Sequence, residues 1–144
     1  MAKFSKIFVR DDEKKMAKIR KYLQNGFGAE YLDDFMKELD APGIKEFDKA
    51  FAVITENYVF SYSFYEVNAL SLVPLKDIVN VYSSNCFFGR YDCNMKAIAV
   101  ETSKVRCYFS KCMIKSKIPQ YEELLETLKK YCRYNEGSLM VQEA

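Results

Sequence analysis

Two segments near the start of the chain carry apolar residues at helical spacing. Met16, Ile19 and Leu23 recur every three or four residues within 11–26, so they share one face of a helix. A second stripe, within 28–43, consists of Leu32, Phe35, Met36 and Leu39. Because isolated helices of this length are marginal in water, we predict two helices that pack on the body of the domain. The alternative is a free hairpin of helices that binds a partner.

After Phe47 the apolar residues alternate with a period of two, as in half-buried strands. The pair Glu56-Asn57 stands where a two-residue turn is expected, because Asn tolerates positive φ. On the strand that follows, the pattern places Tyr58, Phe60, Tyr62 and Phe64 on one side. The predicted strands are 50–55, 58–65, 70–73, one from Ile78 onward, 95–102 and 105–114. A turn-rich loop is predicted over 83–94.

Pro74 interrupts the strand pattern without ending it. Proline lacks a backbone N–H, so in a sheet it is confined to a strand edge, a strand end or a bulge. Residues 74–77 therefore predict a corner that redirects the chain before Ile78. Lys76 and Asp77 lie at that corner, where their charges can stay in water.

The clearest helix pattern lies near the C-terminus. Pro119 suits a first helical turn, acidic residues follow it, and basic residues fill the last turns. The apolar stripe consists of Tyr121, Leu124, Leu125, Leu128, Tyr131 and Cys132. The 144 residues are therefore predicted to form a single domain. Its parts are a helical extension over 1–46, an antiparallel β body over 47–118, a capping helix over 119–135 and a tail over 136–144.

Composition narrows the chemistry. Hydrophobic residues make up 49% and charged residues 29% of the chain, as in ordinary globular proteins. No apolar run approaches the ~20 residues of a membrane helix, and the first residues lack a signal-peptide pattern. We therefore expect a cytoplasmic protein. The chain has no histidine, which excludes Ser-His-Asp triads, Cys-His pairs and histidine-ligated metals.

The cysteines are five in number, and their spacing lacks the close pairs typical of zinc sites. An odd number of cysteines favours reduced thiols over a disulfide framework. We expect no cofactor, no metal site and no catalytic residue, hence a protein that is not an enzyme. A four-thiolate site and a redox sensor at Cys107 and Cys112, near Lys111 or Arg106, remain as alternatives.

Charge is unevenly distributed along the first fifty residues. Residues 1–25 hold eight basic and three acidic side chains, whereas residues 26–50 hold three basic and seven acidic. Opposite blocks so close in sequence predict two helices whose solvated faces attract each other. Nucleic-acid binding is not expected, because the acidic block would cancel the basic one.

The order of elements resembles the pleckstrin-homology-like superfold, as found in uncharacterised bacterial proteins. The stretches "VITENYVFSYSF" and "LVPLKDIVNVY" carry the resemblance. The matching positions are Thr55, Tyr58, Val59, Val73, Pro74, Leu75, Asp77 and Ile78. It implies an α+β fold, a bent antiparallel sheet sandwich or barrel capped by the C-terminal helix, here with two N-terminal helices. It also implies that Leu75 and Ile78 turn inward at the corner, and Lys76 and Asp77 outward.

The resemblance implies a binding function rather than a reaction. Phosphoinositide-binding members use a basic cluster around the first strand–strand loop, but this chain has Glu56 there and Glu66 in the next loop. Other members bind proteins through the sheet edge or the groove beside the helix. We therefore expect a non-enzymatic binding or scaffolding module that contacts a protein partner or a second copy of itself.

The sequence offers one candidate patch, Phe87, Phe88, Arg90 and Tyr91, whose composition is typical of interface anchors. The alternative is that Phe87 and Phe88 are strand residues that point into the core. A different function, peripheral binding to anionic lipid, would use the basic segments 14–21 and 111–117.

Overall fold

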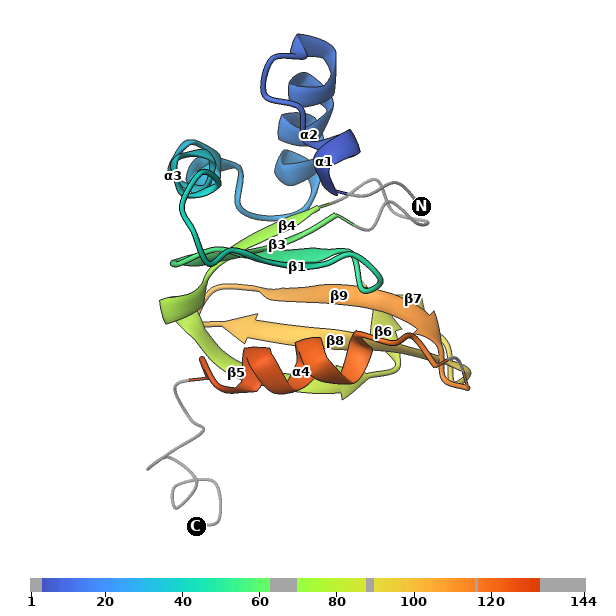
Figure 1. The fold of residues 1–144 in the computed structure, drawn as a ribbon. Helices are drawn as coiled ribbons and strands as arrows, with labels where there is room; N and C mark the ends of the chain where they lie inside the picture. Colours follow the sequence, from blue (N-terminus) through green and yellow to red (C-terminus); the bar gives the residue numbers. More distant parts are fainter. Residues whose placement is uncertain (1–3, 63–69, 88–89, 116, 133–144) are drawn as a thin grey trace.

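The computed structural model describes residues 4–62, 70–87, 90–115 and 117–132 (Figure 1). The helices are α1 (Phe4–Ile7), α2 (Glu13–Asn25), α3 (Leu32–Glu38) and α4 (Tyr121–Lys129), with short 3₁₀ turns η1 (Ala29–Tyr31) and η2 (Leu75–Asp77). The strands are β1 (Lys45–Phe47), β2 (Ala52–Ile54), β3 (Tyr58–Ser61), β4 (Ser71–Pro74), β5 (Ile78–Ser84), β6 (Cys86–Phe87), β7 (Arg90–Tyr91), β8 (Met95–Thr102) and β9 (Arg106–Met113).

The elements form an α+β arrangement of stacked layers. Helices α1 to α3 cover one face of a four-stranded sheet, β1-β2-β3-β4, and a three-stranded sheet, β5-β8-β9, lies against its other face with α4 (Figure 1). The paired strands are antiparallel in all three sheets, the third being the small β6–β7 hairpin. Among the described strands no pairing joins the two larger sheets, so neither closes into a barrel.

The four-stranded sheet is buried on both faces, and β3 shows why. Successive side chains of a strand point to opposite faces, so Tyr58 and Phe60 face the helices while Val59 faces the second sheet. The ring of Phe60 lies 5.9 Å from that of Phe4 and 5.3 Å from that of Phe35. The predicted aromatic side of this strand is confirmed for Tyr58, Phe60 and Tyr62. Phe64 lies outside the described residues.

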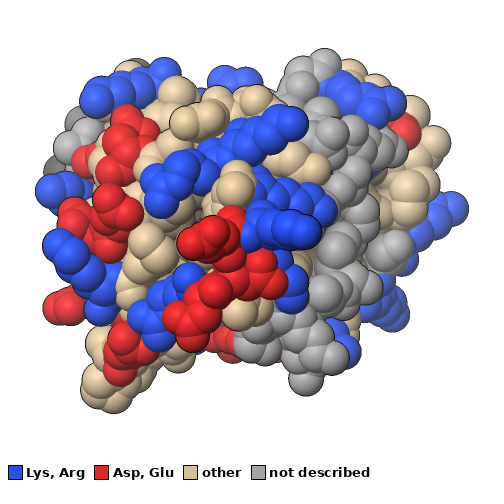
Figure 2. All heavy atoms as spheres, turned by 90° about the horizontal axis from the view of Figure 1, so that it is seen from above, with Lys and Arg blue, Asp and Glu red and all other residues tan. Residues whose placement is uncertain are grey.

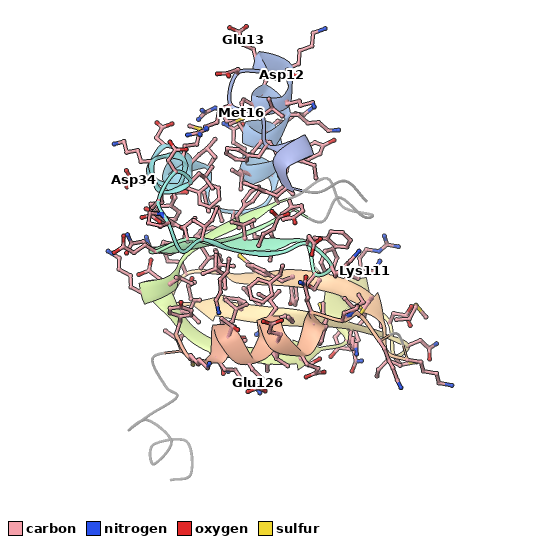
Figure 3. The ribbon with its side chains drawn as sticks, in the orientation of Figure 1. Asp12, Glu13, Met16, Asp34, Lys111 and Glu126 are labelled. Atoms are coloured by element: carbon pink, nitrogen blue, oxygen red, sulfur yellow. The ribbon has the colours of Figure 1, made fainter. Side chains whose placement is uncertain are left out.

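Helix α4 contributes its apolar stripe to the core between the two sheets. Tyr121, Leu124 and Leu128 are buried there beside residues of β5 and β9, such as Ile78 and Phe109. Glu126 lies on the outer side of the helix (Figure 3). The predicted C-terminal helix and its buried stripe are confirmed over Tyr121–Lys129.

The predicted N-terminal helices are confirmed as α2 and as η1 continuing into α3. The Asp12 side chain caps α2 by accepting a hydrogen bond from the Lys15 N–H at 3.1 Å. Arg20 of α2 pairs with Asp33 of α3 at 3.9 Å, as the opposite charge blocks predict. Figure 2 shows basic and acidic side chains intermingled over this helical face.

The corner after β4 is confirmed except at Asp77, which is half-buried rather than fully turned outward. Leu75 and Ile78 are buried, Lys76 is exposed, and the backbone makes the single 3₁₀ turn η2. Pro74 ends β4, an edge strand of its sheet. There, proline removes no hydrogen bond from the ladder, because its nitrogen can face away from the neighbouring strand.

The outer edge of β4 is covered by the chain that links α2 to α3. Leu72 N donates to Phe27 O at 2.9 Å, and Phe27 N donates to Leu70 O at 3.1 Å. Glycines flank Phe27 because side chains would collide with the backbone at β4. A Cβ on Gly26 would lie 2.1 Å from the carbonyl oxygen of Leu70, just before β4, and a Cβ on Gly28 would lie 2.1 Å from that of Leu72. This contact joins the helical layer to the sheet and removes one of its two open edges.

Several short elements differ from the prediction. The sequence pattern places no strand before residue 50 and a loop over 83–94, whereas the structure contains β1 at Lys45–Phe47 and the β6–β7 hairpin. The single turn of α1 was also not predicted. The β body therefore begins at Lys45 rather than at residue 47. These elements are two to four residues long, too short to show a hydrophobic period.

Gly28 provides a test of the β4 contact. Gly28 and Gly43 both have positive φ, 107° and 92°, but a Cβ on Gly43 meets nothing within 4 Å. Gly43→Ala should lower the free energy of unfolding by about 1–2 kcal/mol, the cost of the left-handed backbone alone. Gly28→Ala should cost about 1–3 kcal/mol more, because the helical layer must move off β4. Equal losses of unfolding free energy in the two variants, measured by urea denaturation, would contradict this contact.

Candidate functional site

Large apolar side chains reach the surface in two places. Within the described ranges, the exposed ones are Ile44 (37%), Tyr91 (81%), Met113 (54%), Ile114 (46%) and Tyr131 (41%). Ile44 and Tyr131 line a groove beside β1. The other three lie where β7 and β9 end. Exposed apolar groups that cluster are candidates for binding surfaces, whereas scattered ones are not.

The groove has a volume of about 590 Å³ and lies between the start of β1, the end of β2 and the last turns of α4. Its lining consists of Ala41, Pro42, Gly43, Ile44, Lys45, Ile54, Thr55, Glu56, Thr127 and Tyr131. The lining is thus mainly apolar, with one basic and one acidic side chain. Such a size and composition are typical of sites that take a small ligand or a peptide side chain.

One wall of the groove is the start of β1, an edge strand of the four-stranded sheet. Residues of an antiparallel strand bond alternately to the two neighbouring strands. Thr55 N donates to Tyr58 O on the β3 side at 2.9 Å. The backbone N–H and C=O of the preceding residue, Ile54, therefore point toward β1. Lys45 stands opposite Ile54 in the ladder, so the backbone groups of Lys45 point toward β2. The next residue, Glu46, turns its N–H and C=O outward, and no strand in the described part of the chain pairs with this edge.

The opposite wall is α4, whose position is fixed at both ends. Gln120, just before the helix, accepts a hydrogen bond from Lys49 N at 2.7 Å. Past the other end, the Cys132 thiol donates to Val79 O at 2.9 Å. Thr127 on α4 and Tyr131, two residues past its end, therefore line the groove from a segment that is held on both sides.

The third wall, residues 41–43, follows α3, and Glu38 anchors that helix to the turn between β2 and β3. Its carboxylate accepts hydrogen bonds from Thr55 Oγ1 at 2.5 Å, Asn57 N at 3.0 Å and Asn57 Nδ2 at 2.6 Å. Partial burial raises the pKa of Glu38, but these hydrogen bonds together outweigh it, so its pKa is lowered. Two residues later Asp40 accepts two hydrogen bonds from Arg10, at 2.6 and 3.1 Å.

The patch predicted from the sequence is not a single surface. Phe87 is buried among Met95, Ala97, Ala99 and Tyr108 beneath the β6–β7 hairpin, so it is a core residue and not a surface anchor. Its burial agrees with the alternative left open by the sequence. Phe88 lies outside the described residues. Arg90 and Tyr91 are exposed on β7.

Sequence reasoning missed the groove residues Ile44 and Tyr131, and also Met113 and Ile114. Tyr131 continues the apolar stripe of the last helix, so the sequence predicts a core position for it. The regular helix ends at Lys129 and the chain continues in tighter turns, with Tyr131 N donating to Leu128 O at 3.0 Å; the ring there is 41% exposed. Ile44 gives no signal of its own, because β1 has only three residues.

Cys107 and Cys112, the two cysteines of the redox-sensor alternative, offer little nucleophilic character. Burial raises the pKa of Cys107 to about 11. Burial also raises the pKa of Cys112, although the nearby Lys96 acts in the opposite direction. Because the thiolate is the reactive form, these shifts disfavour the redox-sensor alternative. In the described ranges no group of three or more Cys, Asp or Glu side chains is placed to hold a metal ion.

None of the described helices has both the length and the apolar character needed to cross a membrane. Comparisons of the chain with protein families, curated proteins and solved structures found no match.

The Glu38 anchor predicts a pH dependence of stability. Its pKa is lower in the folded than in the unfolded state, where it is about 4.3. The stabilisation is thus complete above the unfolded pKa and is lost as pH falls through the folded one. Glu38→Gln should lower the free energy of unfolding by about 1 kcal/mol at neutral pH, and the difference from wild type should shrink below about pH 4.

Urea denaturation across this pH range measures the effect. Asn57→Ala removes one side-chain donor from Glu38 and should weaken the same pH dependence partly. A difference between wild type and Glu38→Gln that stays constant down to acid pH would show that the carboxylate charge does not hold α3.

Proposed function

We propose that the chain is a non-enzymatic binding module that takes an extended peptide segment of a partner protein in the groove between β1 and α4. The order of elements supports a pleckstrin-homology-like assignment: a sheet of four consecutive strands, the η2 corner, a second antiparallel sheet and a C-terminal helix packed beside them. The reduced cysteines expected from the sequence fit a cytoplasmic module. No catalytic role is part of the proposal.

The observation that carries the proposal is the contrast between the two edges of the four-stranded sheet. The outer edge of β4 is covered by Gly26–Gly28 and ends in Pro74, whereas the edge of β1 is open in the described part of the chain. Proteins normally protect the edges of their sheets, because an open edge pairs with other strands. An open edge beside an apolar groove is the arrangement that strand addition uses.

The lining of the groove indicates which features such a peptide must have. Its backbone would pair with the outward N–H and C=O of Glu46, and an apolar side chain would lie between Ile44 and Tyr131. Since side chains of a strand alternate, every second residue of the peptide would face the groove. Lys45 and Glu56 at the rim can each pair with a peptide side chain of opposite charge.

Replacing the same side chain at the two candidate surfaces decides which one binds the peptide. Peptides selected from a random display library on the wild-type protein serve as the probe, with affinity measured by fluorescence anisotropy. Tyr131→Ala should weaken binding at least tenfold, as expected for an aromatic anchor. Tyr91→Ala, at the end of β7, should leave the affinity within about twofold, which is less than about 0.5 kcal/mol.

Both tyrosines are exposed, so both variants should retain their melting temperatures. A loss of binding in Tyr91→Ala alone would move the site to the β6–β7 hairpin. Equal binding by both variants, or a library that yields no binder, would contradict the groove.

A further inference from the structure

The second exposed apolar cluster lies where β7 and β9 end. Ile114 N donates to Asn94 O, and Met113 is the ladder partner of Met95, so the end of β9 lies against the turn that follows β7. Tyr91, three residues before Asn94, is the most exposed of the large apolar side chains in the described ranges. We call Arg90, Tyr91, Met113, Ile114, Lys115 and Lys117 the hairpin end. It forms one extremity of the molecule (Figure 1).

Basic side chains surround these apolar groups. Segments 86–96 and 111–118 contain the bases Arg90, Lys96, Lys111, Lys115 and Lys117 and a single acid, Asp92. Lys115 and Lys117 are exposed on the chain that follows β9. Lys111 lies at the same end of β9 (Figure 3), with its Nζ 5.8 Å from the centre of the buried Phe87 ring. The combination is protruding apolar side chains within a positively charged rim.

We propose that the hairpin end docks on an anionic lipid surface, with Tyr91, Met113 and Ile114 entering the boundary between headgroups and acyl chains. Exposed aliphatic groups gain free energy in that layer, and lysines beside them are attracted to anionic headgroups. A protein partner fits less well, because lysine is depleted at the centre of protein interfaces. A nucleic acid fits less well too, because Met113 and Ile114 offer nothing to phosphates or stacked bases.

The structure selects one of the two basic segments that the sequence offers for lipid contact. Segment 14–21 belongs to α2, whose Arg20 is paired with Asp33 and which packs on the far face of the four-stranded sheet. Segment 111–117 belongs to the hairpin end. The groove lies at the last turns of α4. The hairpin end lies near the first turn of α4, where Lys96 lies over the Tyr121 ring. A molecule docked by the hairpin end therefore keeps the groove clear of the membrane.

Sedimentation with lipid vesicles tests the proposal. The full chain should bind phosphatidylcholine vesicles that contain phosphatidylserine and not vesicles of phosphatidylcholine alone, and added salt should weaken the binding. Lys115→Gln/Lys117→Gln should lower the partition coefficient by about thirtyfold, from the attraction of two lysines. Met113→Ser/Ile114→Ser should lower it as well, most visibly at high salt, where the apolar contribution dominates.

Lys14→Gln/Lys21→Gln on α2 is the matched control, because it removes the same charge from exposed positions elsewhere. The proposal is overturned if the wild type does not bind anionic vesicles at low salt, if the α2 control loses as much as the hairpin variant, or if Met113→Ser/Ile114→Ser changes nothing. Binding to a single-stranded RNA oligonucleotide without vesicle binding would overturn it too. Peptide and vesicle binding are measured separately, so failure of one leaves the other standing.

Discussion

The backbone contact between Gly26–Gly28 and β4 organises the structure. It places α2 and α3 over one face of the four-stranded sheet, where Phe60 and its aromatic neighbours become buried. The contact needs glycine at positions 26 and 28, because a side chain there would meet the carbonyl oxygens of Leu70 and Leu72. With one face under helices and the other against the second sheet, β3 is buried on both sides, and the sheet has only its edges left to offer a partner.

The two edges of the four-stranded sheet therefore have different roles. The β4 edge is used internally, whereas the β1 edge meets an apolar groove walled by α4 and by the loop that follows α3. The hydrogen bonds of Glu38 and Asp40 hold that loop, and Gln120 and Cys132 hold the helix. A groove with rigid walls loses little conformational entropy on binding, which favours peptide recognition over a purely structural role for this edge.

Long periodic segments could be predicted from the sequence, and short ones could not. The stripes of α2, α3 and α4 and the alternation in β9 extend over enough residues to show a period. By contrast, β1, β6 and β7 are defined by their partners in space. The same limit applies to the sites: Phe87 and Tyr131 both look apolar in the sequence, but tertiary packing buries Phe87 and exposes Tyr131. The Pro74 corner was predictable because its cause, a missing N–H, is local.

Hydrogen exchange at the Glu46 amide tests the central claim most directly. The account predicts that this amide exchanges fast in the free protein, while the Lys45 and Phe47 amides, which face β2, are protected. Adding a selected peptide should then protect Glu46. A Glu46 amide already protected in the free protein would show that the β1 edge is covered, and would contradict the proposed mode of binding.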